Sequence, residues 1–218
     1  MIRVLVIDDS AVMRTFIASV IEAQPGMEVA GVVSDPVLAI DRIRRAAPDV
    51  ITLDVEMPRM NGLDFLRTLM AVRPLPVVMI SSLTREGADT TMRALELGAV
   101  DFIPKPASAV EFEGVGPIIV EKIRAASQAR VVRKHRAAAV PREQRPKPLC
   151  AVAGTLGTIV GIGASTGGVE ALREILPQLP ADTPPVLIAQ HMLPGFTPAF
   201  ARRLDSLCEI AVKEAEDG

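Results

Sequence analysis

The sequence predicts an α/β protein with two parallel sheets, a complete one followed by the first part of another. Short aliphatic runs alternate with helical patterns through residues 1–125, and a similar alternation resumes after residue 151. The chain contains no Trp, no Tyr and only six Phe, so aliphatic side chains must fill the core. Such cores are typical of parallel sheets that are buried on both faces. We therefore expect a five-stranded, doubly wound parallel sheet in residues 1–125 and part of a second α/β domain in residues 151–218.

In the first part, five apolar runs predict strands and five patterned stretches predict helices. Asp35 followed by Pro36 is typical of an N-cap and the first helical position, and Gly98 predicts the end of the fourth helix. The predicted strands are residues 3–7, 28–33, 50–53, 76–80 and 101–103. The helical markers are Val12, Met13, Phe16, Ile17, Val20 and Ile21 on one face of the first helix, Leu63, Leu66 and Met70 in the third, residues 91–97 in the fourth, and Ile118, Ile119 and Ile123 in the fifth.

Residues 126–150 differ in character from the parts on either side. Nine of the residues from 121 to 150 are Lys or Arg and only two are acidic, and Pro141, Pro146 and Pro148 interrupt any helix. A basic docking arm is one interpretation. We favour a solvated linker between two domains, because basic blocks without aromatic residues are usually solvated.

The second part, residues 151–218, predicts three strands and two helices. The strands are residues 158–162, 186–189 and 210–213, and the helices are residues 169–176 and 198–207. The chain ends on Glu216, Asp217 and Gly218, polar turn residues that normally lead into another element. Because three strands would leave much apolar surface open, we expect a domain truncated at its carboxyl end.

Composition excludes several classes of function. The formal charge of −2 gives no general attraction to nucleic acids or anionic membranes. Cys150 and Cys208 have neither disulfide nor metal-site spacing. The amino terminus is a short strand rather than a signal peptide, and no apolar run approaches the roughly 20 residues of a membrane span. We expect a cytoplasmic protein with no membrane insertion and no nucleic-acid partner.

Charged side chains follow several strands of the first predicted sheet. Asp8 and Asp9 follow the first strand, Asp54 follows the third, and Lys105 follows the fifth. Ligands of open α/β sheets bind at these carboxyl ends. Clustered carboxylates repel each other unless a cation neutralises them, and hard oxygen ligands suit Mg²⁺. With an ammonium opposite them to pair with a phosphoryl oxygen, Asp54 is predicted to accept a phosphoryl group at a metal-assisted site.

Three motifs carry a resemblance to response-regulator receiver domains, which have a flavodoxin-like fold. They are Ile7-Asp8-Asp9-Ser10, the stretch from Leu53 through Asp54 to Gly62, and Lys105-Pro106. The resemblance implies that a histidine kinase phosphorylates Asp54. It implies that Asp9, Asp54 and the backbone carbonyl of Glu56 hold Mg²⁺, with Asp8 assisting partly through water. It further implies a switch formed by Ser81, Phe102 and Lys105, with the neighbouring Ser82 as the other possible register for the serine.

A serine stands in a glycine-dense turn at the start of the second part. Ser165 lies between Gly163 and Gly167, in the G-x-S-x-G spacing of a nucleophile elbow between a strand and a helix. A serine hydroxyl needs a base, and the chain has two histidines. His135 lies in the linker, whereas His191 follows the next strand at the same edge as Ser165. We expect a hydrogen bond between Ser165 and His191.

A dinucleotide site is the competing interpretation of this turn. Gly161 and Gly163 resemble the start of G-x-G-x-x-G, but the third glycine arrives one residue late, at Gly167. Gln190 and His191 follow the next strand, where an acidic residue would be needed to bind a ribose. Nucleotide binding is therefore the poorer interpretation.

Residues 158–218 resemble the catalytic domain of chemotaxis methylesterases of the CheB type, a Rossmann-like α/β domain. The matching motifs are residues 161–168 and 189–196. The resemblance implies Ser165 as nucleophile, His191 as base, and Thr166 as a contact to substrate or oxyanion. The family's third triad residue, an aspartate, would lie beyond this chain, and Asp205 and Asp217 are poor substitutes.

The order of the two domains resembles that of the whole family. It implies a protein-glutamate methylesterase and protein-glutamine glutaminase that acts on methyl-accepting chemoreceptors without a cofactor for the esterase. Phosphorylation of Asp54 would then uncover the active site. The alternative is a phosphorylation-dependent binding module, since the third triad residue is missing. A transcription factor is disfavoured, because residues 151–218 show no helix-turn-helix pattern.

Overall fold

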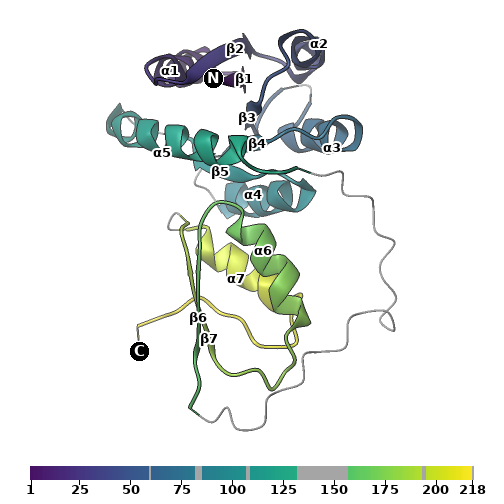
Figure 1. Ribbon diagram of the computed structural model, residues 1–218, viewed down its shortest axis with the longest axis vertical. Helices are drawn as coiled ribbons and strands as arrows, with labels where there is room; N and C mark the ends of the chain where they lie inside the picture. Colours follow the sequence, from purple (N-terminus) through teal and green to yellow (C-terminus); the bar gives the residue numbers. More distant parts are fainter. Residues whose placement is uncertain (59, 82–84, 107–108, 132–156, 193–194, 218) are drawn as a thin grey trace. The chain divides into compact units, whose positions relative to one another are not determined.

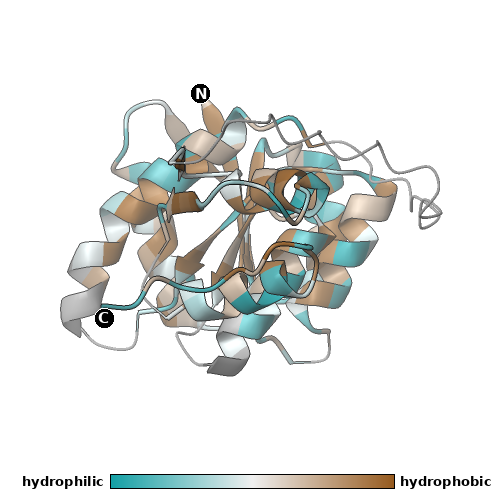
Figure 2. Ribbon diagram, turned by 90° about the horizontal axis from the view of Figure 1, so that it is seen from below, coloured by the Kyte–Doolittle hydropathy of each residue, from teal (hydrophilic) through white to brown (hydrophobic). Residues whose placement is uncertain are grey.

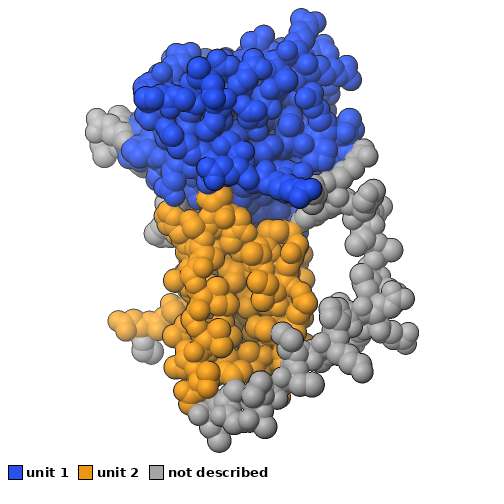
Figure 3. Space-filling view, in the orientation of Figure 1, with its two compact units in different colours: residues 1–134 blue, residues 135–218 orange. Residues whose placement is uncertain are grey.

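The computed structural model describes residues 1–58, 60–81, 85–106, 109–131, 157–192 and 195–217. The chain divides into two compact units, Met1–Lys134 and His135–Gly218 (Figure 3). The predicted linker begins inside a helix that ends at Ser127, and its residues 132–150, with His135, lie outside the described part of the chain.

In its described part, the first unit alternates five strands with five helices (Figure 1). All strand pairs are parallel, in the order β2-β1-β3-β4-β5, so the predicted doubly wound sheet is confirmed. The strands are β1 (Ile2–Ile7), β2 (Met27–Val33), β3 (Val50–Asp54), β4 (Val77–Ser81) and β5 (Asp101–Pro104). The helices are α1 (Ala11–Glu22), α2 (Pro36–Ala46), α3 (Gly62–Val72), α4 (Arg85–Leu97) and α5 (Ala109–Ser127).

Aliphatic side chains fill the core of this unit, as the composition predicts. Strands β3 and β4 are buried along their whole length, and the strands in Figure 2 are predominantly brown, the colour of hydrophobic residues. On one face, Met13, Ile17 and Ile21 of α1 join Ile119 and Ile123 of α5 in a single buried cluster with residues of the strands. The sheet is therefore a rigid platform for the loops at its carboxyl edge.

One predicted core residue of α1 is exposed instead. Val12 keeps 67% of its surface accessible, while Met13, Ile17 and Ile21 are buried. It shares a helical stripe with Phe16 and Val20, which are only partly buried, and it lies in the first turn, where the helix leaves the sheet edge. The 3.6-residue period identifies the apolar face of a helix, but it does not show how much of that face is packed against the rest of the protein.

The predicted helix boundaries follow from local chemistry. The Asp35 carboxylate accepts a hydrogen bond from the Val37 N–H at 2.8 Å, and Pro36 occupies the first helical position, as expected. Gly98 ends α4 with a left-handed φ of 108°. Ser10 and Asn61 cap α1 and α3 at the same edge of the sheet, which fixes where both helices begin.

The described part of the second unit has two parallel strands, two α-helices, one short 3₁₀ turn and an irregular tail. Its elements are β6 (Val160–Ala164), α6 (Gly168–Ile175), the 3₁₀ turn η2 (Leu176–Gln178), β7 (Val186–Gln190) and α7 (Thr197–Asp205). Strands β6 and β7 pair in register from Val160 with Val186 to Ala164 with Gln190. Leu187 is 65% exposed, so this small sheet has an open apolar face.

The strand predicted at residues 210–213 is wrong. Residues 211–217 have no regular secondary structure in the part of the chain that the structure describes. The Val212 N–H donates to the Asp205 carboxylate at 2.8 Å, and the Thr197 hydroxyl bonds to Glu214, so the segment is tied to α7 rather than to the sheet. A short apolar run becomes a strand only where a neighbouring strand accepts its backbone hydrogen bonds.

None of the helices that the structure describes is long and apolar enough to cross a membrane.

Candidate functional site

The predicted acidic residues meet at the carboxyl edge of the first sheet. Strands β1 and β3 are neighbours, with Ile7 in register with Leu53, so Asp8 and Asp54 emerge side by side. Both are buried, whereas Asp9 is exposed. One carboxylate oxygen from each of the three residues lies within 4.8 Å of the others. The sheet topology therefore brings together the three acids, as the sequence predicts.

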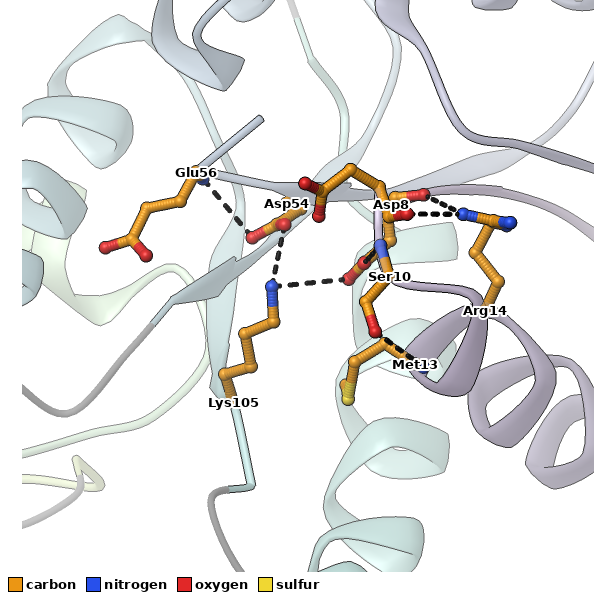
Figure 4. A network of polar contacts seen from close by, with 8 residues as sticks. Asp8, Ser10, Met13, Arg14, Asp54, Glu56 and Lys105 are labelled. Atoms are coloured by element: carbon orange, nitrogen blue, oxygen red, sulfur yellow. Dashed lines mark hydrogen bonds and ion pairs between the residues drawn. The ribbon is translucent and has the colours of Figure 1, made fainter. Parts of the chain in front are cut away.

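Lys105 lies against two of these acids (Figure 4). Its Nζ is 2.8 Å from Asp54 Oδ2 and 3.9 Å from Asp8 Oδ2. The backbone holds the lysine there, because the Lys105 N–H donates to the Ser81 carbonyl at 2.7 Å as β5 leaves the sheet beside β4. An ammonium in this position can pair with an oxygen on Asp54 or on a group attached to it.

The pKa values of these groups are perturbed by their burial. Burial and the neighbouring Asp54 charge raise the pKa of Asp8 from 3.8 to about 6. Burial also raises the pKa of Asp54, against the opposing effect of the Lys105 hydrogen bond. Burial alone would lower the pKa of Lys105, but its bond to Asp54 and the acid charges outweigh burial and raise it. The cluster thus holds more negative charge than the one lysine neutralises.

These residues fit a divalent cation. Asp8 Oδ2 is buried and accepts no hydrogen bond from the described residues, so a ligand position on it is open. The Glu56 N–H donates to Asp54 Oδ1 at 3.3 Å, and the Glu56 side chain extends away from Asp54 in Figure 4. This arrangement is compatible with the expectation that Glu56 contributes its backbone rather than its carboxylate. Carboxylate and carbonyl oxygens are the ligands that Mg²⁺ prefers.

Ser81 and Phe102 lie on neighbouring strands β4 and β5, and both are buried. The Ser81 hydroxyl donates to the Gly87 carbonyl at 3.3 Å, and Ser82 lies outside the described residues. The carboxylate of Asp101, just before Phe102, pairs with Lys122 of α5 at 2.9 Å. Sequence reasoning missed this pair, because nothing in the local pattern links residues 21 positions apart. The switch role of Ser81 and Phe102 stays a prediction.

We predict that Asp8→Asn stabilises the first unit in metal-free buffer. In the unfolded chain the Asp8 carboxyl ionises near pH 3.8, but in the folded chain only near pH 6. Between these values the folded state holds more protons, so the free energy of unfolding falls as pH rises, and the loss persists above pH 6. A shift of about two pKa units corresponds to about 3 kcal/mol. At pH 8 the variant should therefore be more stable by roughly this amount.

Urea unfolding monitored by circular dichroism, with EDTA present, measures this difference. The advantage of the variant should shrink towards pH 3.8 and should reverse when Mg²⁺ is added, because only the wild type gains a full ligand set. If the wild type and Asp8→Asn were equally stable at pH 8 as well as at low pH, this result would contradict the assignment of a charged, desolvated Asp8.

The second candidate site lies at the carboxyl edge of the small sheet. Ala164 and Gln190 are register partners, so the next residues, Ser165 and His191, leave the two strands together. Ser165 Oγ is 3.2 Å from His191 Nδ1, and the His191 N–H donates to the Ala164 carbonyl at 2.7 Å. Both side chains are exposed and line an open depression. The predicted hydrogen bond is present.

The structure requires glycine at both positions 167 and 168, for different reasons. Gly167 has a left-handed φ of 77°, which allows the sharp turn into α6. A Cβ on Gly168 would lie 2.3 Å from Gln190 Oε1 and 2.7 Å from Ala164 Cβ, so only glycine fits. A Cβ on Gly163 would meet no described atom within 4 Å, so the motif glycine before the serine is not required by packing.

Gln190 is a residue of this site that sequence reasoning missed. Its side-chain amide donates to the Ser165 carbonyl at 2.9 Å and to the His191 carbonyl at 3.2 Å. It thereby bridges the backbones of Ser165 and His191. Thr166 is half-buried in the same turn, and its role stays a prediction. Asp205 bonds to the Val212 N–H, so its carboxylate is used within α7 and the tail.

Comparison with known proteins gives two family matches. Residues 4–114 match the response regulator receiver domain, and residues 160–218 match the CheB methylesterase. The crystal structure of the response regulator domain of Thermotoga maritima CheB is 46% identical, with a TM-score of 0.56, and the match covers 60% of this chain and 98% of that one.

Two curated relatives extend the similarity along the chain. Proteins from Salmonella typhimurium and Bordetella pertussis, each named protein-glutamate methylesterase/protein-glutamine glutaminase, are 50% and 51% identical over 220 residues. The matches cover 100% of this chain and 61% of each relative. The chain thus spans about three fifths of the length of these proteins.

Proposed function

The chain belongs to the response regulator receiver family and matches the CheB methylesterase family in its second unit, and on this basis we propose that it is a phosphorylation-controlled serine esterase of chemotaxis. Its substrates would be glutamate methyl esters and glutamines of methyl-accepting chemoreceptors, and its phosphoryl source a histidine kinase in the cytoplasm. The observation that carries the esterase half is the 3.2 Å contact between Ser165 Oγ and His191 Nδ1.

In the first unit, Asp54 would accept the phosphoryl group. Bound Mg²⁺, held by Asp9, Asp54 and the Glu56 carbonyl with the support of Asp8, would neutralise charge on the carboxylates and on the phosphoryl oxygens. Lys105, now 2.8 Å from Asp54 Oδ2, would pair with a phosphoryl oxygen after the transfer. Ser81 would bond another oxygen once its hydroxyl leaves the Gly87 carbonyl, and Phe102 would move with it.

In the second unit, His191 would take the proton from Ser165 Oγ as that oxygen attacks the ester carbonyl carbon. The bond to the methoxy oxygen then breaks, and His191 returns the proton so that methanol leaves. Water would hydrolyse the acyl-serine by the same route in reverse and release glutamate; with a glutamine substrate, ammonia leaves in place of methanol. Gln190 would hold the Ser165 and His191 backbones during both steps, and the Thr166 N–H would contribute to an oxyanion hole.

The two activities can be tested in one comparison. We expect acetyl phosphate and Mg²⁺ to add one phosphoryl group to the chain, measured by intact mass, and to increase methanol release from a methylated receptor peptide. Asp54→Asn should show neither effect, because the acceptor oxygen is lost while the size of the side chain is kept. Its basal methanol release should equal that of the unphosphorylated wild type.

The outcomes separate the two halves of the proposal. Phosphorylation without any methanol release would favour the alternative of a phosphorylation-dependent binding module. Methanol release that does not respond to the phosphodonor, in a chain shown to carry the phosphoryl group, would argue against control by the first unit.

A further inference from the structure

Asp9 differs from the other acids of the first site in how it is held. Asp8 and Asp54 are buried at the sheet edge and accept hydrogen bonds from the Ser10 and Glu56 N–H groups. Asp9 is exposed, and among the described residues its carboxylate accepts no hydrogen bond. The direction of this side chain therefore depends on the conformation of its own backbone.

Arg14 holds that backbone from the second turn of α1 (Figure 4). Its Nη1 donates to the carbonyl of Asp8 at 2.9 Å and to the carbonyl of Asp9 at 2.8 Å. These carbonyls belong to the two peptide planes on either side of the Asp9 Cα. Because each plane is rigid, fixing both of them fixes φ and ψ of Asp9, and with them the direction of its Cβ.

We propose that Arg14 is a positioning residue for the binding of the divalent cation, because it orients Asp9 towards Asp8 and Asp54. The inference rests on the proposed metal site. Without Arg14 the loop would have to be ordered when the cation binds, and the entropy of ordering about one residue corresponds to about a tenfold weaker affinity. The guanidinium does not itself touch the cation.

Positioning by Arg14 can be distinguished from a purely structural role and from a purely electrostatic role. An arginine with a purely structural role should affect the melting temperature but not the affinity for the cation. Arg42 also donates to a backbone carbonyl, that of Ala30 on β2 at 2.7 Å, but it lies away from the acids and serves as the matched control. If the positive charge of Arg14 mattered most, its removal would strengthen cation binding, since the charge lies beside the acidic cluster. Positioning predicts weaker binding.

The experiment titrates the 218-residue chain with Mg²⁺ and follows its melting temperature and its rate of phosphorylation by acetyl phosphate. Arg14→Met should raise the half-saturating Mg²⁺ concentration in both measurements about tenfold, while the phosphorylation rate at saturating Mg²⁺ stays that of the wild type. Arg14→Lys, which can reach one carbonyl, should give a smaller shift and serves if the methionine variant fails to fold. Arg42→Met should lower the melting temperature without shifting the Mg²⁺ midpoint.

An unchanged or lower midpoint in Arg14→Met, with a normal wild-type titration, would overturn the positioning role and leave the proposed metal site intact. A midpoint shifted equally by Arg42→Met would overturn it too. A wild type that shows no Mg²⁺ dependence at all would overturn the metal site itself, and the inference with it.

Discussion

Ser165→Ala is expected to lower methanol release from a receptor glutamyl methyl ester by about a thousandfold or more. The variant removes the protein atom that forms the covalent bond to the substrate in the proposed mechanism, while the 2.9 Å bond from Gln190 to the Ser165 backbone carbonyl remains. Binding of the substrate should change little, so the loss should appear in kcat. Methanol release should be measured with two proteins. One is the 218-residue chain, and the other contains the same residues in a protein as long as the relatives named above.

Non-additivity makes this prediction sharper. His191→Gln should cost about as much as Ser165→Ala, and the double variant should be no worse than either single one, because the pair acts as a unit. Ser206→Ala is the matched control, since the Ser206 hydroxyl is exposed and donates only to the Arg203 carbonyl of its own helix. Losses that multiply in the double variant, or an active Ser165→Ala, would show that another group supplies the nucleophile.

The residues that sequence reasoning placed correctly share one property. Asp8, Asp54 and Lys105, and likewise Ser165 and His191, directly follow or end strands of a parallel sheet, and parallel strands bring their carboxyl ends to one edge. Once the strands are recognised from their aliphatic runs, the proximity of these side chains at the sheet edge can be predicted. The fold of the first unit was predictable for the same reason, because each strand has its own aliphatic run in the sequence and can be recognised without knowing which strands it pairs with.

The residues that were missed act through partners that the hydrophobic pattern does not reveal. Arg14 and Gln190 donate to backbone carbonyls and Lys122 pairs with a carboxylate, and only the folded chain places these acceptors beside them. The wrong strand at residues 210–213 has the same cause in reverse. Its pattern suits a strand, but its Val212 N–H bonds to Asp205 of α7.

Gly62→Ala is expected to destabilise the first unit by about 3 kcal/mol and to slow phosphorylation of Asp54 at saturating Mg²⁺. A Cβ at Gly62 would lie 2.1 Å from the Asp54 carbonyl oxygen, and the Gly62 N–H already donates to the Val55 carbonyl at 3.0 Å. The start of α3 can therefore move away only if the backbone that carries Asp54 moves as well. Gly114→Ala in α5 is the control, because its Cβ would meet no described atom within 4 Å, and alanine there should stabilise the helix by about 0.5–1 kcal/mol. Urea unfolding and the phosphorylation rate measure both effects; a Gly62→Ala protein as stable and as fast as Gly114→Ala would show that the helix can shift without disturbing Asp54.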